Sequence, residues 1–327
     1  MDALGSFGMT EDLDYIPISV ATLMPTAAIG LDLFQREQSS ERLVLYRGAD
    51  FPLSVDDLHR LQSRGTSRLF ITKESRSQYQ KYLRKVAVAG NDGTIPISVK
   101  VGALNEVVRD VLHATFTRGE VSQTVAAAEK LGTLAADMIL RDQFAVDDLL
   151  QVLHHDYTTF THSTNVAFYC GVLAAELGHG RTEIEQITTG GLLHDLGKLE
   201  IDEKILCKPG RLDDWEFKVI KSHPLIGLRK LADREDLNQG QLMMVYQHHE
   251  RLDGRGYPVG VLEDEIHPWA KICAVVDVFE ALTSNRPYRT PMSHRRALAL
   301  QDRDAGAAFD REILECWTKI IKNNLIK

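Results

Sequence analysis

The stretch that decides the fold is Gly190–Lys198, "GGLLHDLGK". An apolar run leads directly into His194 and Asp195, and a glycine and Lys198 follow them. Burying a carboxylate without compensation is costly, so Asp195 needs a cation beside it if this segment folds into a core. A metal ion is the simplest such cation. The segment is therefore the first candidate for a metal site.

Further histidines and aspartates recur along the second half of the chain, at gaps of roughly 25 to 32 residues, about two short helices with their loops. Successive candidates can return to one point inside a helical bundle at this spacing. Imidazoles and carboxylates without thiolates suit Fe, Mn, Zn or Ni. The predicted metal ligands are His162, His194, Asp195, His223, His248, His249 and Asp277.

The alternative is that these side chains are core residues whose polar atoms are hydrogen-bonded. One histidine on an apolar face usually has that explanation, but five histidines and two aspartates at this spacing favour a metal centre. If Asp195 bridges, two ions can lie about 3.5–4 Å apart, the separation used in phosphoester hydrolysis. His154 and His155 do not fit the pattern, and we assign them structural or surface roles.

The composition is that of a soluble globular protein: 327 residues, 44% hydrophobic and 26% charged, with a net charge of −8. A negative chain does not suit a nucleic-acid polymer, whose phosphates are bound by clustered Lys and Arg. The four cysteines are far apart and fit a reducing compartment. The N-terminus has no signal-peptide pattern, and no apolar run approaches the ~20 residues of a membrane span. We expect a cytoplasmic protein that is not bound to a membrane.

The chain changes character near residue 100. Before it, "ERLVLY" and "SRLFIT" predict strands, and "PLSVDDLHRLQSRG" predicts a helix that begins at a Ser54–Asp57 capping box and ends at Gly65. After it, apolar residues spaced by three and four predict helices. The expected fold is mainly α-helical, with a small α/β regulatory or interaction domain over residues 1–100 and a helical bundle over residues 101–327.

Five motifs occur in order after residue 190. They are "HDLGK" at 194–198, "KPGRL" at 208–212, "KSHPLIG" at 221–227, "HHERLDGRGYP" at 248–258 and "DVFEALTSNRPYR" at 277–289. With these motifs, residues 150–315 resemble the HD-GYP phosphodiesterases of the HD superfamily of metal-dependent hydrolases. The resemblance implies an HD-type helical bundle. It also identifies the glycine-rich turn after His249 as the family's GYP loop.

The resemblance implies two divalent transition-metal ions, Fe or Mn, with Zn or Ni as alternatives. It assigns His162, His194, Asp195 and Asp277 to one ion, and Asp195, His223, His248 and His249 to the other. Members with three metals have a glutamate one helical turn before the first histidine, where this chain has Thr158. A hydroxyl replaces a carboxylate poorly at a third cation, so we expect two ions.

The resemblance also implies roles in catalysis and in substrate binding. Asp195 bridges the ions, and Lys198 stands near a phosphate or leaving oxygen, where its charge stabilises the transition state. Tyr257, Arg286 and Arg289 are the expected substrate contacts, since a guanidinium offers a bidentate fork. Glu250 and Asp253 either orient ligands or shape the loop.

The expected substrate is cyclic di-GMP, a bacterial second messenger, which would be opened to pGpG; the sequence leaves further cleavage to GMP open. An HD hydrolase for another nucleotide such as cyclic GMP-AMP, or a diiron oxygenase, is a second interpretation. A third is a cyclic di-GMP receptor with little turnover, acting through the N-terminal domain on a protein partner. The sequence leaves homodimerisation open.

Overall fold

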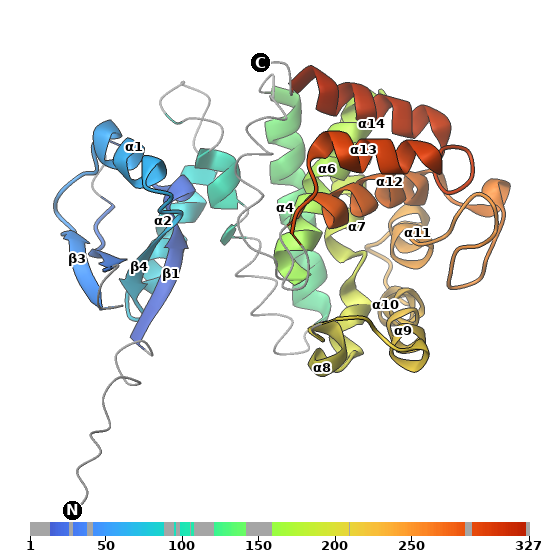
Figure 1. Ribbon diagram of the computed structural model, residues 1–327, viewed down its shortest axis with the longest axis horizontal. Helices are drawn as coiled ribbons and strands as arrows, with labels where there is room; N and C mark the ends of the chain where they lie inside the picture. The colour runs from blue at the N-terminus through green and yellow to red at the C-terminus, as the bar shows by residue number, and fades with distance from the viewer. Residues whose placement is uncertain are drawn as a thin grey trace, which may run out of the picture. The chain divides into compact units, whose positions relative to one another are not determined.

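The computed structural model describes residues 14–25, 29–37, 42–87, 95, 99–104, 106–107, 121–141, 159–208, 210–284 and 290–324. The chain divides into two compact units, residues 1–107 and 108–327. The expected mainly helical architecture with a small α/β unit at the N-terminus is confirmed (Figure 1). None of the helices in the described part of the chain is long and apolar enough to cross a membrane.

The N-terminal unit is built on a four-stranded sheet with the order β1-β4-β2-β3, in which every pair is antiparallel. Its strands are β1 (Tyr15–Ser19), β2 (Leu33–Arg36), β3 (Leu43–Arg47) and β4 (Arg68–Thr72). Leu69 and Ile71 alternate with more exposed neighbours along β4, as a strand with one face on the core requires. The two predicted strands are present as β3 and β4. In the sheet, β2, which was not predicted, lies between them.

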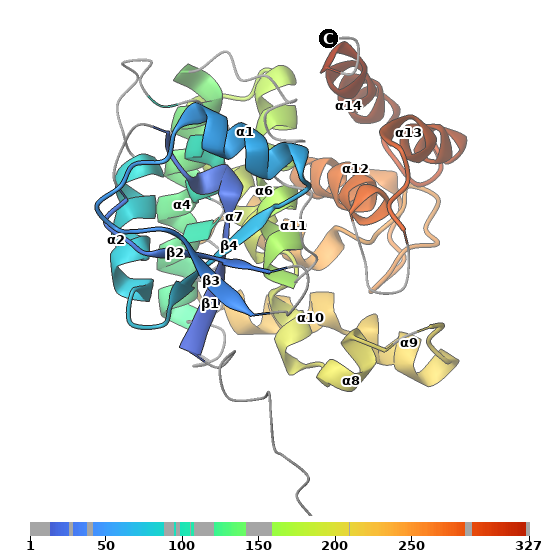
Figure 2. The same cartoon turned by 60° about the vertical axis from the view of Figure 1, so that its left-hand side comes forward.

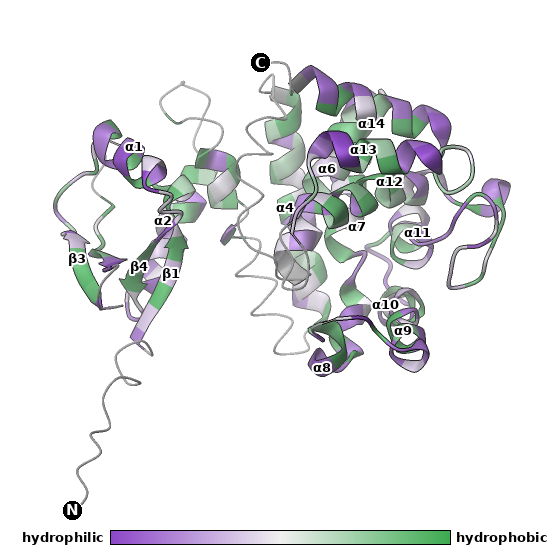
Figure 3. Cartoon of the chain, in the orientation of Figure 1, coloured by the Kyte–Doolittle hydropathy of each residue, from purple (hydrophilic) through white to green (hydrophobic). Residues whose placement is uncertain are grey.

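Helices α1 (Val55–Ser63) and α2 (Arg76–Ala87) accompany the sheet, together with the short 3-10 turn η2 (Val20–Thr22). The predicted capping box at the start of α1 is present, because Ser54 and Asp57 each accept a hydrogen bond from the other's backbone. The helix ends at Ser63, and the predicted stop, Gly65, follows its C-cap residue Arg64 with a φ of 69° that suits glycine. Figure 3 colours most of α1 as hydrophilic, in keeping with its exposed side chains.

The C-terminal unit is a helical bundle. Its elements are α4 (Val121–Arg141), α6 (Thr159–Glu176), α7 (Arg181–Leu193), η3 (Leu196–Glu200), α8 (Glu203–Leu206), α9 (Asp214–Ile220), α10 (His223–Leu231), α11 (Gln239–Gln247), η4 (Glu263–Glu265), α12 (Pro268–Thr283), α13 (His294–Arg303) and α14 (Arg311–Asn324).

Helices α6 and α12 form the centre of this bundle. Helix α6 packs against α4, α7, α12 and α14, and α12 also contacts α11 and α13. Both helices are apolar on most sides, which is typical of a buried helix. Tyr169, Phe279 and Trp317 from α6, α12 and α14 meet with ring centroids 5.2–6.2 Å apart. This packing fixes the two helices that carry His162 and Asp277.

Candidate metal centre

The structure brings all seven predicted metal ligands together from five places in the bundle. His162 lies on α6, His194 and Asp195 follow α7, His223 begins α10, His248 and His249 follow α11, and Asp277 lies on α12. They form three overlapping groups, and within each group the potential ligand atoms lie within 4.8 Å of one another. All are buried except His249, which is 22% exposed.

Asp195 lies at the centre of the cluster and faces both sides of it. Its Oδ2 lies 3.4 Å from Nε2 of His162 and 3.3 Å from Nε2 of His194. Its Oδ1 lies 3.3 Å from Nε2 of His223 and 3.8 Å from Nε2 of His248. The two oxygens of one carboxylate therefore face two different histidine pairs, as a carboxylate that bridges two ions requires.

Asp277 completes one side of the cluster. Its Oδ1 lies 3.0 Å from Nε2 of His162 and 3.9 Å from Nε2 of His194. Its other oxygen, Oδ2, lies 3.8 Å from Nδ1 of His249. Asp277 consequently belongs with His162 and His194. Its second oxygen faces His249, which belongs to the other histidine group.

The outward-facing nitrogens of three histidines fix the direction of their rings. Each Nδ1 lies within hydrogen-bond distance of a backbone carbonyl three or four residues earlier, and a carbonyl can only accept, so Nδ1 carries the proton. In a neutral ring the inward Nε2 then holds a lone pair that is available to a metal. The acceptors are Gly191 for His194 at 2.7 Å, Ile220 for His223 at 2.7 Å and Met244 for His248 at 3.0 Å.

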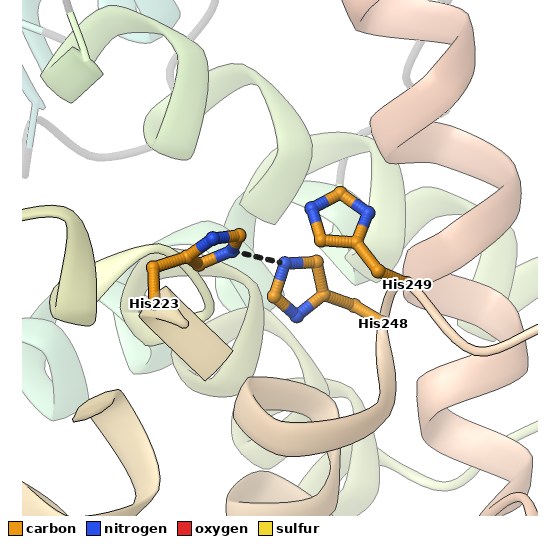
Figure 4. A group of neighbouring side chains, drawn as sticks. All are labelled: His223, His248 and His249. Carbon is orange, nitrogen blue, oxygen red and sulfur yellow. Dashed lines mark hydrogen bonds between the residues drawn. The ribbon is translucent and has the colours of Figure 1, made fainter. Parts of the chain in front are cut away.

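The cluster fits a bound cation. Nε2 of His223 lies 3.1 Å from Nε2 of His248 (Figure 4). Both Nδ1 atoms donate to carbonyls, so in neutral rings this approach sets two lone pairs against each other. Nε2 of His194 and Oδ1 of Asp195 are buried and have no hydrogen-bond partner among the described residues. Cations between these atoms would satisfy all four, so the side chains could hold metal ions.

Burial and charge set the protonation of the cluster. Burial lowers the pKa of His249 to about 3, and burial together with neighbouring His249 lowers the pKa of His248 well below its ordinary value. Both rings are therefore neutral ligands at neutral pH. For Asp195, burial opposes ionisation, but the Lys198 ammonium and His194 hold its pKa well below the ordinary value.

Comparison with known families identifies the bundle, because the HD domain family matches residues 147–313. The chain belongs to the HD domain family. Its sequence is 32% identical over 203 residues to the cyclic di-GMP phosphodiesterase PA4108 of Pseudomonas aeruginosa, a match that covers 62% of this chain and 49% of the relative. It is 36% identical over 166 residues to the 3'3'-cGAMP-specific phosphodiesterase 3 of Vibrio cholerae, covering 50% of this chain and 35% of that protein.

The chain thus spans about half or less of the length of these two relatives. Among solved structures, Bd1817, an HDG"Y"P protein from Bdellovibrio bacteriovorus, superposes with a TM-score of 0.71 at 20% identity, over 94% of this chain and all of that chain. At this identity the match establishes a shared fold. The resemblance to HD-GYP proteins that the motifs indicated is confirmed.

Glu280 is a part of this HD domain site that the sequence did not reveal. Its side chain is 1% exposed, and Oε2 accepts a short hydrogen bond from Nδ1 of His162. Its Oε1 accepts from Nδ2 of Asn165 at 2.9 Å and from the hydroxyl of Ser284. Burial lowers the pKa of His162, but the Glu280 carboxylate together with Asp277 outweighs burial and raises that pKa well above its ordinary value. Glu280 therefore orients the His162 ring.

The predicted GYP loop of the HD domain folds back on Glu250. This carboxylate accepts from the backbone N–H of Val259 at 2.8 Å and of Gly260 at 3.0 Å. A Cβ at Gly256 would overlap the backbone of Glu250, so only glycine allows this close turn. Asp253 instead forms an ion pair with Arg251 at 2.9 Å. Glu250 and Asp253 thus shape the loop.

Tyr257 lies beside the histidines that precede the loop. Its ring centroid is 4.6 Å from that of His249 and 6.4 Å from that of His223. Nζ of Lys221 lies 5.2 Å from the Tyr257 ring, a cation–π distance. The loop therefore places an aromatic face next to the predicted metal ligands, and Lys221 at the C-terminal end of α9 adds a cation beside that ring.

Lys198 contacts the cluster directly, because its Nζ donates to Oδ2 of Asp195 at 2.6 Å. The predicted substrate contacts Arg286 and Arg289 lie outside the described residues, as does Thr158. Their roles stay predictions from the sequence.

Proposed function

We propose that the chain is a metal-dependent phosphodiesterase that hydrolyses cyclic di-GMP to pGpG, with a second cleavage of pGpG to GMP left open. The observation that carries this proposal is the placement of Asp195, whose two oxygens face two separate histidine pairs. The name of the Pseudomonas relative supports the substrate.

Two divalent ions suit the site, with Fe or Mn preferred and Zn or Ni as alternatives for these nitrogen and oxygen donors. His162, His194, Asp195 and Asp277 would hold one ion. Asp195, His223, His248 and His249 would hold the other. When bound, such a pair supplies Lewis-acid stabilisation of the phosphoester and a nucleophile from water at neutral pH.

The other side chains bind and orient the substrate. Lys198, 19% exposed beside Asp195, places an ammonium where negative charge develops on phosphate or leaving oxygens. The ring of Tyr257 offers a stacking face for a guanine, and burial raises its pKa, so its hydroxyl stays a hydrogen-bond donor. Arg286 and Arg289 are the proposed phosphate or guanine contacts.

A second candidate substrate is cyclic GMP-AMP, which the name of the Vibrio cholerae relative favours. It differs from cyclic di-GMP in one base, so the same ligands and Lys198 would serve it. Discrimination then depends on contacts with that base, for which Tyr257 and the two arginines are the candidates.

The N-terminal unit, over residues 1–100, is the proposed site of regulatory input, through a protein partner or homodimer formation. The cytoplasm is the proposed location, in keeping with the low cysteine content and the acidic chain. The acidic chain also supports small nucleotides rather than nucleic-acid polymers as substrates.

Product analysis tests the proposal. Anaerobically prepared protein loaded with Mn or Fe is incubated with cyclic di-GMP, cyclic GMP-AMP or duplex RNA, and the products are separated by chromatography. The expected result is pGpG from cyclic di-GMP, with no turnover by a His194→Ala/Asp195→Ala control. Tight binding of cyclic di-GMP without turnover would replace the proposal with a receptor function. Cleavage of cyclic GMP-AMP alone would change the substrate and leave the chemistry in place.

A further inference from the structure

The N-terminal unit contains a cavity of about 230 Å³ between its sheet and α1. Figure 2 shows α1, β2 and β3 of this unit. Three arginines line the cavity, Arg47 from β3, Arg60 from α1 and Arg64 from the end of α1. Tyr46 and Gln35 lie in the same wall. We call this space the arginine cavity.

The arginine cavity carries excess positive charge. Asp57 is its one lining carboxylate, and it is buried. Oδ2 of Asp57 lies 2.6 Å from Nη2 of Arg47, and Oδ1 lies 2.6 Å from Nη2 of Arg60. Arg64 forms no ion pair with any carboxylate in the described part of the chain. Three guanidinium groups against one carboxylate leave a local charge of +2, in a protein whose net charge is −8.

One donor in this cavity lacks an acceptor. Nε of Arg47 is buried and has no hydrogen-bond partner among the described residues. Buried N–H groups almost always have an acceptor, so Arg47, a residue of the cavity wall, carries an unsatisfied donor. Tyr46 adds a second donor, because burial and the nearby Asp57 carboxylate raise its pKa and keep its hydroxyl protonated. The cavity wall thus offers hydrogen-bond donors, and Asp57 is its one negatively charged acceptor.

We propose that the arginine cavity binds a phosphate group, either free or carried by a small phosphorylated metabolite. A phosphate dianion matches the local charge of +2, and its tetrahedral oxygens can accept from guanidinium groups that approach from two sides, β3 and α1. The cavity has room for a small molecule. This site involves no metal ligand and does not depend on the proposed phosphodiesterase activity.

Hydrogen exchange on the full-length protein tests the proposal, because it separates this cavity from the metal centre. Inorganic phosphate and GMP are the probes, and chloride at equal ionic strength is the salt control. The expected result is saturable protection of Leu43–Arg47 and Val55–Ser63. GMP binding more tightly than inorganic phosphate would identify a phosphorylated metabolite, and equal or weaker binding would identify free phosphate.

Two variants make the test specific. Arg64→Gln removes a cavity cation that has no ion pair to lose, and Arg84→Gln removes an exposed cation on α2 outside the cavity. Arg64→Gln should weaken phosphate binding about tenfold, the loss expected for one charge-assisted hydrogen bond, while Arg84→Gln leaves it unchanged. The proposal is overturned if the wild type shows no saturable protection in these segments. Equal weakening by both substitutions would also overturn it, because it would mean a general charge effect.

Discussion

The Nζ atom of Lys198 lies 2.6 Å from Oδ2 of Asp195, the carboxylate oxygen that also faces His162 and His194. One oxygen is thus shared between an ammonium and the histidines of one proposed ion. The ammonium helps to keep Asp195 ionised, since it lowers the pKa of that carboxyl. We therefore expect two separable contributions from Lys198, one to the charge of Asp195 and one to the reacting phosphate.

Lys198→Met separates these contributions. Removal of the ammonium should leave the metal content intact, because the histidines and carboxylates remain, but should lower the single-turnover rate by about 10²-fold, the loss expected for one transition-state donor. Elemental analysis and rapid-quench kinetics measure the two quantities. An unchanged rate would mean that Lys198 does not act on the reacting phosphate. Loss of metal would assign it a role in ligand charge only.

Metal stoichiometry tests the ligand set. We expect two transition-metal ions per chain, because Thr158 replaces the carboxylate that a third ion would need. His194→Ala together with Asp195→Ala should remove both ions, since Asp195 faces both histidine pairs. His59→Ala, an exposed histidine on α1, is the matched control and should retain them. Three ions per wild-type chain would show that the interpretation of Thr158 is wrong.

Glu280→Gln tests the orientation of His162. The substitution keeps the shape of the side chain but replaces the charged acceptor of the Nδ1 proton, so the ring is held less firmly and is a weaker ligand. We expect metal affinity to fall about 10- to 100-fold with the fold retained. Ser284→Ala, which removes a different hydrogen bond to Glu280, should have a smaller effect. Competition with a chromophoric chelator measures both affinities, and equal affinities for wild type and Glu280→Gln would refute the role.

The clustering of the seven predicted metal ligands was predictable because all of them except His162 lie in short motifs, and the motif spacing matches the helix lengths of the bundle. The role of Glu280 was not predictable, because a carboxylate one turn after Asp277 can face either solvent or the core. Its direction depends on how α12 packs on α6. In the sheet, β1 was missed because it contains Pro17, which is tolerated there since β1 is an edge strand. Strand β2 was missed because it has only four residues.

Gly197→Ala tests whether the close packing of the HDLGK motif against α10 holds His223 in place. A Cβ at Gly197 would overlap the carbonyl oxygen of His223 and lie 2.7 Å from the backbone nitrogen of Gly227. Helix α10 would have to move, and His223 with it, away from Asp195. We expect a loss of about 1–3 kcal/mol in the free energy of unfolding, together with loss of metal.

Gly180→Ala is the control for this substitution, because a Cβ there meets nothing within 4 Å. Urea unfolding and metal analysis measure both variants. If Gly197→Ala retains wild-type stability and metal content, the close approach of η3 and α10 does not hold His223 in place.

Asp57 should make the stability of the N-terminal unit depend on acid pH. Hydrogen bonds from Ser54, and then the charges of Arg47 and Arg60, lower its pKa below the ordinary value of 3.8. A carboxyl whose pKa is lower in the folded state stabilises the fold when ionised. Its contribution is therefore complete at neutral pH, and it is lost as the pH falls below about 3.8 and through the lowered value.

Asp57→Asn removes this contribution and leaves two guanidinium groups without their carboxylate. At pH 7 it should lower the free energy of unfolding of the N-terminal unit by about 1–3 kcal/mol, and the difference from wild type should shrink as the pH falls toward about 3. Hydrogen exchange over Val55–Ser63 at several pH values follows this unit separately from the bundle. Asp56→Asn, which removes an exposed charge from the same turn, is the control and should have a smaller effect at pH 7. A difference between wild type and Asp57→Asn that does not change with pH would mean that packing, and not the ionised carboxylate, accounts for the loss.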